Sequence, residues 1–190
     1  MRPRRLVRLY RGPLNASVRQ QLTIGMASPT KQKQFVGLVA WLIASFIAAG
    51  IGGAASVTAG AFYTQLVRPE WAPPSWVFGP VWTVLYALMG IAAWLVWRVA
   101  GFRAAKTALT LFLVQLALNA LWSWLFFGWH RGALAFADIV LLWALIVATS
   151  VAFWGIKPLA GALLVPYLLW VSFAIALNYS VWQLNSAFLG

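Results

Sequence analysis

The sequence contains no cysteine, one histidine and two acidic residues, Glu70 and Asp138, in a chain of 190 residues. Without cysteine the protein forms no disulfide bond and offers no thiolate ligand to a metal. With His130 as the sole imidazole, it also lacks the groups on which most acid–base and metal-dependent catalysis relies. These shortages exclude most classes of enzyme, and we expect no metal site and no required cofactor.

Charge is scarce as well, since 8% of the residues are charged and 63% are hydrophobic. A soluble domain carries roughly 25% charged residues, so this composition indicates a membrane protein. The 14 Lys and Arg residues give a net charge of +12, but eight of them precede the first apolar run. A basic tail beside a membrane helix is typical of a topology signal that contacts anionic lipid head groups, and we expect no nucleic-acid partner.

Five apolar runs are long enough for a helix to cross a bilayer, which needs about 20 residues. These runs are Phe35–Val57, Gly79–Val99, Ala104–Phe127, Gly132–Trp154 and Leu159–Trp182. Their apolar residues are continuous rather than alternating, which is not the pattern of a β-barrel. We therefore predict an all-α membrane protein, a bundle of five transmembrane helices over residues 34–185, preceded by a basic tail over residues 1–33.

The basic residues are distributed unevenly between the two ends of the predicted bundle. The tail and the connections on its side hold twelve of them, and the opposite side holds two. The positive-inside rule then predicts a cytoplasmic N-terminus, with inner or outer membrane left open. Residues 1–25 have no apolar core, and Met26 stands nine residues before the first run. We expect these 25 residues to be disordered or to result from an upstream mis-start.

The longest connection, residues 58–78, is rich in tryptophan and proline, and we call it the lid loop. It contains Trp71-Ala-Pro-Pro-Ser-Trp76 and leads through Phe78 into the second run. Proline fixes φ and removes a hydrogen-bond donor, so the aromatic rings are held in place. A stiff aromatic loop above a membrane helix favours a flat, apolar ligand over an ion or a sugar.

Polar side chains lie on one face of the third run. Gln115, Asn119 and Trp122 stand at positions i, i+4 and i+7. Amides in hydrocarbon need partners, because each unsatisfied group costs several kcal/mol. Two hypotheses remain compatible: these side chains hydrogen-bond neighbouring helices, or they offer donors and acceptors to a ligand.

Two further helical faces are aromatic. Trp82 and Tyr86 stand one turn apart at the start of the second run, and Trp170, Ala174 and Leu177 share a face of the fifth. The small Ala174 leaves space beside the large Trp170. If these faces converge, they form an aromatic pocket with a few polar groups, which is typical of a small-molecule site.

The first run carries a small residue at every fourth position: Ala44, Ala48, Gly52, Ser56 and Gly60. Small residues at this spacing allow helix backbones to approach closely in lipid. Packing within the bundle, clearance for a ligand and a dimer interface are the three interpretations.

Asp138 is the one acid within a predicted span. An intramembrane carboxylate is a functional candidate, but it lies near the start of its helix, and a structural hydrogen bond is the alternative. No second acid or histidine lies within the spans to form a proton relay. A proton pump is therefore disfavoured.

From about Phe35 to Asn185 the chain resembles the tryptophan-rich sensory protein and translocator protein family. The matching motifs are Trp71-Ala-Pro-Pro-Ser-Trp76, Pro80-Val-Trp82, Leu85-Tyr86, Met89-Gly90, Gln115-Leu-Ala-Leu-Asn119-Ala-Leu-Trp122, Phe126-Phe127-Gly128, Ala137-Asp138, Val165-Pro-Tyr167-Leu-Leu-Trp170 and Leu177-Asn178-Tyr179. The resemblance implies a five-helix membrane protein, usually dimeric, that binds porphyrins, sterols and benzodiazepine-type ligands in a pocket closed by the first loop. The candidate ligand-binding residues are then Trp71, Trp76, Phe78, Trp82, Tyr86, Gln115, Asn119, Trp122, Trp170, Ala174 and Leu177.

Three functions follow from the residues and the resemblance together. The first is a membrane receptor, sensor or carrier for porphyrins, with the macrocycle recognised independently of its metal, since His130 is predicted to lie in a loop. The second is light-dependent degradation of bound porphyrin, with Trp82 and Trp170 as electron donors. The third is a non-catalytic scaffold for lipids or partner proteins. Sterol binding is less favoured, because the recognition pattern that begins at Leu177 and Tyr179 has Gln183 where a cation is expected.

Overall fold

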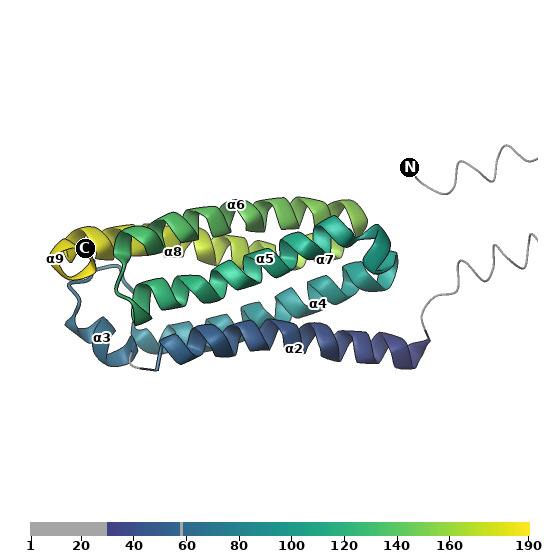
Figure 1. Cartoon of the computed structure of the whole chain (residues 1–190), viewed down its shortest axis with the longest axis horizontal. Helices are drawn as coiled ribbons and strands as arrows, with labels where there is room; N and C mark the ends of the chain where they lie inside the picture. Colours follow the sequence, from purple (N-terminus) through teal and green to yellow (C-terminus); the bar gives the residue numbers. More distant parts are fainter. Residues whose placement is uncertain (1–29, 58) are drawn as a thin grey trace, which may run out of the picture.

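The computed structural model describes residues 30–57 and 59–190, so the predictions for residues 1–25 lie outside the described residues. Within this part of the chain, five helices are long and apolar enough to cross a membrane, and none of its residues forms a β-strand. The spans are Lys31–Ala55, Ser75–Ala104, Lys106–Gly128, Gly132–Ile156 and Pro158–Leu184. The predicted all-α bundle of five transmembrane helices is confirmed, with ends that differ by a few residues from the apolar runs (Figure 1).

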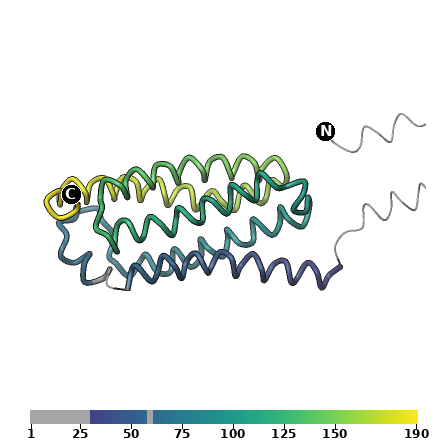
Figure 2. Tube along the Cα trace, viewed as in Figure 1, coloured from purple at the N-terminus to yellow at the C-terminus, as the bar shows by residue number. Residues whose placement is uncertain are grey.

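The helical elements follow one another with short connections, apart from the lid loop. They are α2 (Lys31–Ala55), α3 (Ala59–Gln65), η2 (Ser75–Val77), α4 (Phe78–Ala104), α5 (Lys106–Ser123), the π-helical turn η3 (Trp124–Gly128), α6 (Gly132–Ile156), α7 (Pro158–Leu163), α8 (Val165–Leu184) and α9 (Ser186–Leu189). The trace in Figure 2 shows the long helices running side by side, with α3 and α9 at the same end of the bundle. The lid loop therefore lies at the end opposite to the start of α2.

Close packing, rather than the hydrophobic effect, holds helices together within lipid. α2 packs on α4 and α5, and α6 packs on α5 and α8. Glycine permits two close approaches between α2 and α4: Trp97 lies where a side chain on Gly37 would stand, and Leu42 lies against Gly90. In the core, Phe112 stacks on Phe153 with ring centroids 5.9 Å apart.

Two residues explain where long helices end. Pro166 has no amide hydrogen, so it cannot continue the hydrogen-bond ladder of α7, and the fifth span divides into α7 and α8. Gly101 has φ of 68° and ψ of 176° near the end of α4, a conformation that is almost restricted to glycine. The turn into α5 follows at once.

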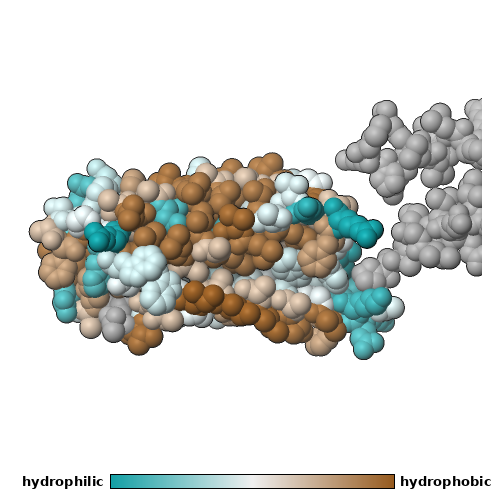
Figure 3. Space-filling view, viewed as in Figure 1, coloured by the Kyte–Doolittle hydropathy of each residue, from teal (hydrophilic) through white to brown (hydrophobic). Residues whose placement is uncertain are grey.

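Most basic residues of the described part lie toward one end of the bundle, whereas Arg68 and Arg131 lie toward the end with the lid loop. Lys31 and Lys33 begin α2, Arg103 and Lys106 flank the turn between α4 and α5, and Lys157 follows α6. Figure 3 shows this hydrophilic end beside a broad hydrophobic surface over the helices. Such a band is what a multi-pass membrane protein presents to lipid.

Candidate ligand-binding site

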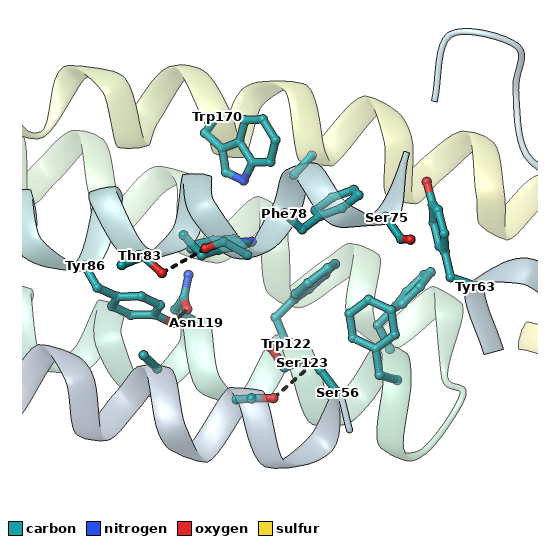
Figure 4. A pocket seen from close by; sticks show the side chains of 18 of the residues that line it. Ser56, Tyr63, Ser75, Phe78, Thr83, Tyr86, Asn119, Trp122, Ser123 and Trp170 are labelled. Atoms are coloured by element: carbon teal, nitrogen blue, oxygen red, sulfur yellow. Dashed lines mark hydrogen bonds between the residues drawn. The ribbon is translucent and has the colours of Figure 1, made fainter. Parts of the chain in front are cut away.

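A cavity of about 580 Å³ lies inside the bundle at the end that carries the lid loop. Its wall is built from α2, α4, α5, η3 and α8, and Tyr63 and the η2 turn of the lid loop close it at one end (Figure 4). The volume falls within the range of roughly 300–1,000 Å³ that small-molecule sites occupy. Aromatic side chains form much of the wall, so the cavity is a candidate site for an apolar ligand.

Nine of the eleven candidate residues line this cavity. They are Trp76, Phe78, Trp82, Tyr86, Asn119, Trp122, Trp170, Ala174 and Leu177. The aromatic faces of the second and fifth spans converge with the polar face of the third. Phe78 and Trp170 meet edge to face with ring centroids 5.8 Å apart, which joins the start of α4 to α8.

The other two candidates, Trp71 and Gln115, lie outside the cavity lining. Trp71 is half exposed and packs edge to face on Phe173, which in turn contacts Trp170. Gln115 is buried one turn below Asn119, where its amide nitrogen lies 3.9 Å from the sulfur of Met89. Both residues therefore lie behind the cavity wall: Trp71 contacts the wall residue Trp170 through Phe173, and Gln115 lies beside Met89.

Phe46, Ala49 and Gly53 of α2 also form part of the wall, and sequence analysis did not name these three residues as candidates. These side chains are apolar or small, as are those of a lipid-facing helix, so composition does not separate the two roles. The small residues spaced every fourth position were the available signal. Gly52 of that series lies against Ser123 of α5, which supports the interpretation of packing within the bundle, and Gly52 and Ser56 both line the cavity, which supports clearance for a ligand as well.

Asn119 links three helices beneath the cavity. The hydroxyl of Tyr86 on α4 donates a hydrogen bond to its carbonyl oxygen, and its amide nitrogen donates to the hydroxyl of Tyr167 on α8 at 3.0 Å. All three side chains are buried. The hypothesis of interhelical hydrogen bonding therefore holds for Asn119, which at the same time borders the cavity.

A second hydrogen bond leaves a donor free at the cavity wall. The indole nitrogen of Trp122 donates to the carbonyl oxygen of Asn178 at 2.9 Å, which fixes the orientation of that amide. The amide nitrogen of Asn178 and the indole nitrogen of Trp170 are both buried and have no hydrogen-bond partner among the described residues. In Figure 4 the indole nitrogen of Trp170 points toward the interior of the cavity. An unsatisfied buried donor costs about 1–3 kcal/mol, so both nitrogens are suited to bind an acceptor on a ligand.

The lid loop is attached to the bundle through Asn185 and holds a cation–π contact within itself. The side chain of Asn185, after α8, accepts a hydrogen bond from the amide of Val67 at 2.9 Å and donates one to its carbonyl at 2.8 Å. The guanidinium of Arg68 lies over the ring of Tyr63 at 4.9 Å from its centroid, and Tyr63 lines the cavity. Trp76 lines the cavity too, yet 73% of its surface is exposed.

The titratable groups near the site are few. Burial raises the pKa of the Tyr63 phenol above its ordinary value, and the nearby Arg68 charge opposes that effect only in part. His130 lies outside the lining and stacks on Phe62 at 4.2 Å. Within residues 30–57 and 59–190, no three His, Asp or Glu side chains come together as metal ligands do.

Asp138 on α6 is buried but does not line the cavity. Its oxygen Oδ2 has no hydrogen-bond partner in the described part of the chain. The structural hydrogen bond considered for this carboxylate is thus not formed at that atom.

Residues 38–183 match the model of the TspO/MBR family. The chain is 44% identical over 146 residues to protein CrtK of Rhodobacter capsulatus, covering 74% of this chain and 89% of that protein. It is 46% identical over 128 residues to tryptophan-rich protein TspO of Chlorobaculum tepidum, covering 65% and 79%, respectively. It is also 44% identical over 131 residues to the human translocator protein, covering 68% of this chain and 78% of that protein.

Proposed function

The chain belongs to the TspO/MBR family of multi-pass membrane proteins, and from that premise we propose that it binds porphyrins and related flat, hydrophobic ligands in the cavity beneath the lid loop. The protein then acts as a membrane receptor, sensor or carrier. The observation that carries the proposal is an aromatic cavity whose wall holds buried hydrogen-bond donors without acceptors.

The shape of the wall supports a flat ligand. Rings from three helices border the cavity: Trp82 on α4, Trp122 on α5 and Trp170 on α8. Aromatic side chains bury large areas in fixed geometry and favour stacked or edge-to-face contacts with another π-system. A porphyrin macrocycle presents such a system on both of its faces.

The polar groups support a ligand that carries acceptors. Asn119 uses its carbonyl oxygen and its amide nitrogen within the protein, whereas Asn178 and Trp170 each leave a nitrogen donor unused. Porphyrin propionates are acceptors of the required kind. A hydrogen bond from an uncharged donor to a charged acceptor contributes about 1.5–3 kcal/mol, which offsets part of the cost of removing a propionate from water.

The cavity wall also favours recognition of the macrocycle over ligation of a central iron. Among the described residues that line it there is no histidine, cysteine or methionine, and the tyrosines are Tyr63 and Tyr86. A tyrosine binds iron as phenolate, and burial of Tyr63 disfavours that form by raising its pKa.

A titration with protoporphyrin IX of the detergent-purified protein tests this proposal through the quenching of tryptophan fluorescence. Trp170→Phe keeps a ring beside Phe78 and removes the donor, and we expect a Kd about 10-fold weaker, as for the loss of one charge-assisted hydrogen bond. Trp154→Phe is the matched control, because Trp154 is exposed on α6 and outside the lining. Equal affinities of the two variants for protoporphyrin IX would show that the indole nitrogen of Trp170 does not bind the ligand. Quenching that does not saturate in any of the proteins would indicate that the porphyrin partitions into the micelle. That result would favour the hypothesis of a non-catalytic scaffold.

A further inference from the structure

The contact between α2 and α4 changes along their length. Away from the lid loop the helices meet closely, with Trp97 at Gly37 and Leu42 at Gly90. Nearer the lid loop, a β-carbon added to Gly53 on α2 or to Gly79 on α4 would have no heavy atom of the rest of the protein within 4 Å. At the level of the cavity, no side chain of the facing helix fills the space beside either glycine.

The exposed part of the cavity wall lies on the same two helices. Six lining residues are exposed, and all of them belong to α2 or to the span that begins at Ser75: Phe46, Gly53, Ser75, Trp76, Gly79 and Thr83. The lining residues of α5, η3 and α8 are buried or half-buried. Four of these residues lie on α2 or α4, so the cavity is open on the side where α2 faces α4, and Ser75 and Trp76 extend this opening to the lid loop.

The other side of α2 is closed at this level. A β-carbon on Gly52 would lie 3.0 Å from the hydroxyl of Ser123 on α5, and the indole nitrogen of Trp124 donates to the carbonyl of Ile51 at 3.0 Å. The segment of α2 from Phe46 to Gly53 is about 10 Å long at 1.5 Å per residue, and it lies within a membrane-spanning helix. The part of the opening beside Phe46 thus lies along the membrane-spanning part of α2 and not at its end.

We propose that ligands enter the cavity laterally from the bilayer, through the opening between α2 and α4, and that Gly53 and Gly79 set the width of this passage. The inference rests on the proposed function of the cavity and adds its route of access. It assigns the site to ligands that first dissolve in the membrane, since such molecules reach the opening without passing the lid loop. Glycine at both positions keeps the passage free of side chains.

Replacing both glycines tests the route. In lipid nanodiscs, we expect Gly53→Phe with Gly79→Phe to slow association of protoporphyrin IX by about 10-fold. The association rate is the readout, because both residues line the cavity and their replacement also affects Kd. Gly50→Phe is the matched control, because Gly50 lies on the same helix, also has open space, and does not line the cavity. Unchanged rates in the double variant would place the route elsewhere. Faster dissociation with an unchanged association rate would show that the two side chains act on the bound ligand and not on its route, and would overturn the proposal.

A second measurement does not depend on porphyrin binding. The natural chain has no cysteine, so Ser123→Cys introduces a single thiol that lines the cavity. We expect the apolar reagent N-phenylmaleimide to label this thiol about 10-fold more slowly when Phe replaces both glycines, and at an unchanged rate in the Gly50→Phe background. Labelling that is insensitive to both changes would overturn the lateral route. Lack of saturable porphyrin quenching together with blocked labelling would overturn only the proposed ligand.

Discussion

Asn119 and Gln115 are buried amides one turn apart on α5, and the structure predicts opposite effects when each is replaced by leucine. Asn119 makes two side-chain hydrogen bonds, to Tyr86 and Tyr167. Gln115 leaves its carbonyl oxygen without a partner, and its nitrogen is 3.9 Å from the Met89 sulfur, a weak contact. Leucine has the branched shape of asparagine and is one heavy atom shorter than glutamine, so the loss of the amide is the main change at both positions.

The magnitude follows from the number of bonds. Interhelical hydrogen bonds in membranes contribute about 0.6 kcal/mol each on average and about 1.7 kcal/mol at most. Asn119→Leu therefore lowers the free energy of unfolding by about 1–3 kcal/mol, depending on how far the two tyrosine hydroxyls find new partners. Gln115→Leu removes a buried oxygen that has no partner, so it is neutral or stabilising by up to about 1 kcal/mol.

Unfolding in mixed micelles of dodecyl maltoside and increasing SDS measures both changes by circular dichroism. A double-mutant cycle of Asn119→Leu with Tyr167→Phe isolates one bond and gives a coupling of about 0.6 kcal/mol. Equal destabilisation by the two leucine variants, or a coupling of zero, would refute the reasoning that the network beneath the cavity holds α4, α5 and α8 together.

Three further predictions concern the turn, the topology and the ligand. Gly101→Ala lowers the free energy of unfolding by about 1–3 kcal/mol in the same micelle assay, because Gly101 has a positive φ. Gly155→Ala on α6 is the control and leaves the free energy of unfolding unchanged, because Gly155 has open space around it. Equal effects of the two substitutions would contradict the backbone argument. In oriented vesicles, an impermeant maleimide labels a thiol introduced by Lys157→Cys from the cytoplasmic side. The same reagent labels a thiol introduced by Gly190→Cys from the opposite side. The reverse pattern would contradict the orientation predicted from the basic residues. In absorbance titrations, free-base and iron protoporphyrin IX bind with Kd values within about threefold of each other, because burial of Tyr63 opposes its binding to the iron as a phenolate. A strong preference for the iron porphyrin, with a shifted Soret band, would contradict recognition of the macrocycle.

The five spans were predictable because each is a long, continuous apolar run, and that feature alone decides whether a helix crosses a bilayer. Helical periodicity also brought Trp170, Ala174 and Leu177 onto one face, and that face does border the cavity. Asn178 was the missing neighbour on this face. Its donor becomes available only because Trp122 occupies its carbonyl oxygen, which is a contact between helices.

Other features depend on three-dimensional arrangement that one sequence does not encode locally. Trp71 and Trp76 belong to the same lid loop, yet only Trp76 borders the cavity, because the path of the loop depends on bonds between Val67 and Asn185, 118 residues apart. The share of α2 in the cavity wall was hidden for another reason. Lipid and an apolar cavity select the same residue types, so Phe46 carries no signal that distinguishes them.

The central claim is that the cavity binds one flat, hydrophobic ligand, and blocking it tests that claim most directly. Ala174 lines the cavity on α8, and Ala176 on the same helix is exposed and outside it. Equilibrium titration of protoporphyrin IX in nanodiscs should give saturable one-to-one binding to the natural chain and to Ala176→Phe, with a Kd at least about 10-fold weaker for Ala174→Phe. Identical binding curves for all three proteins would contradict the claim, because they would place the porphyrin outside the cavity.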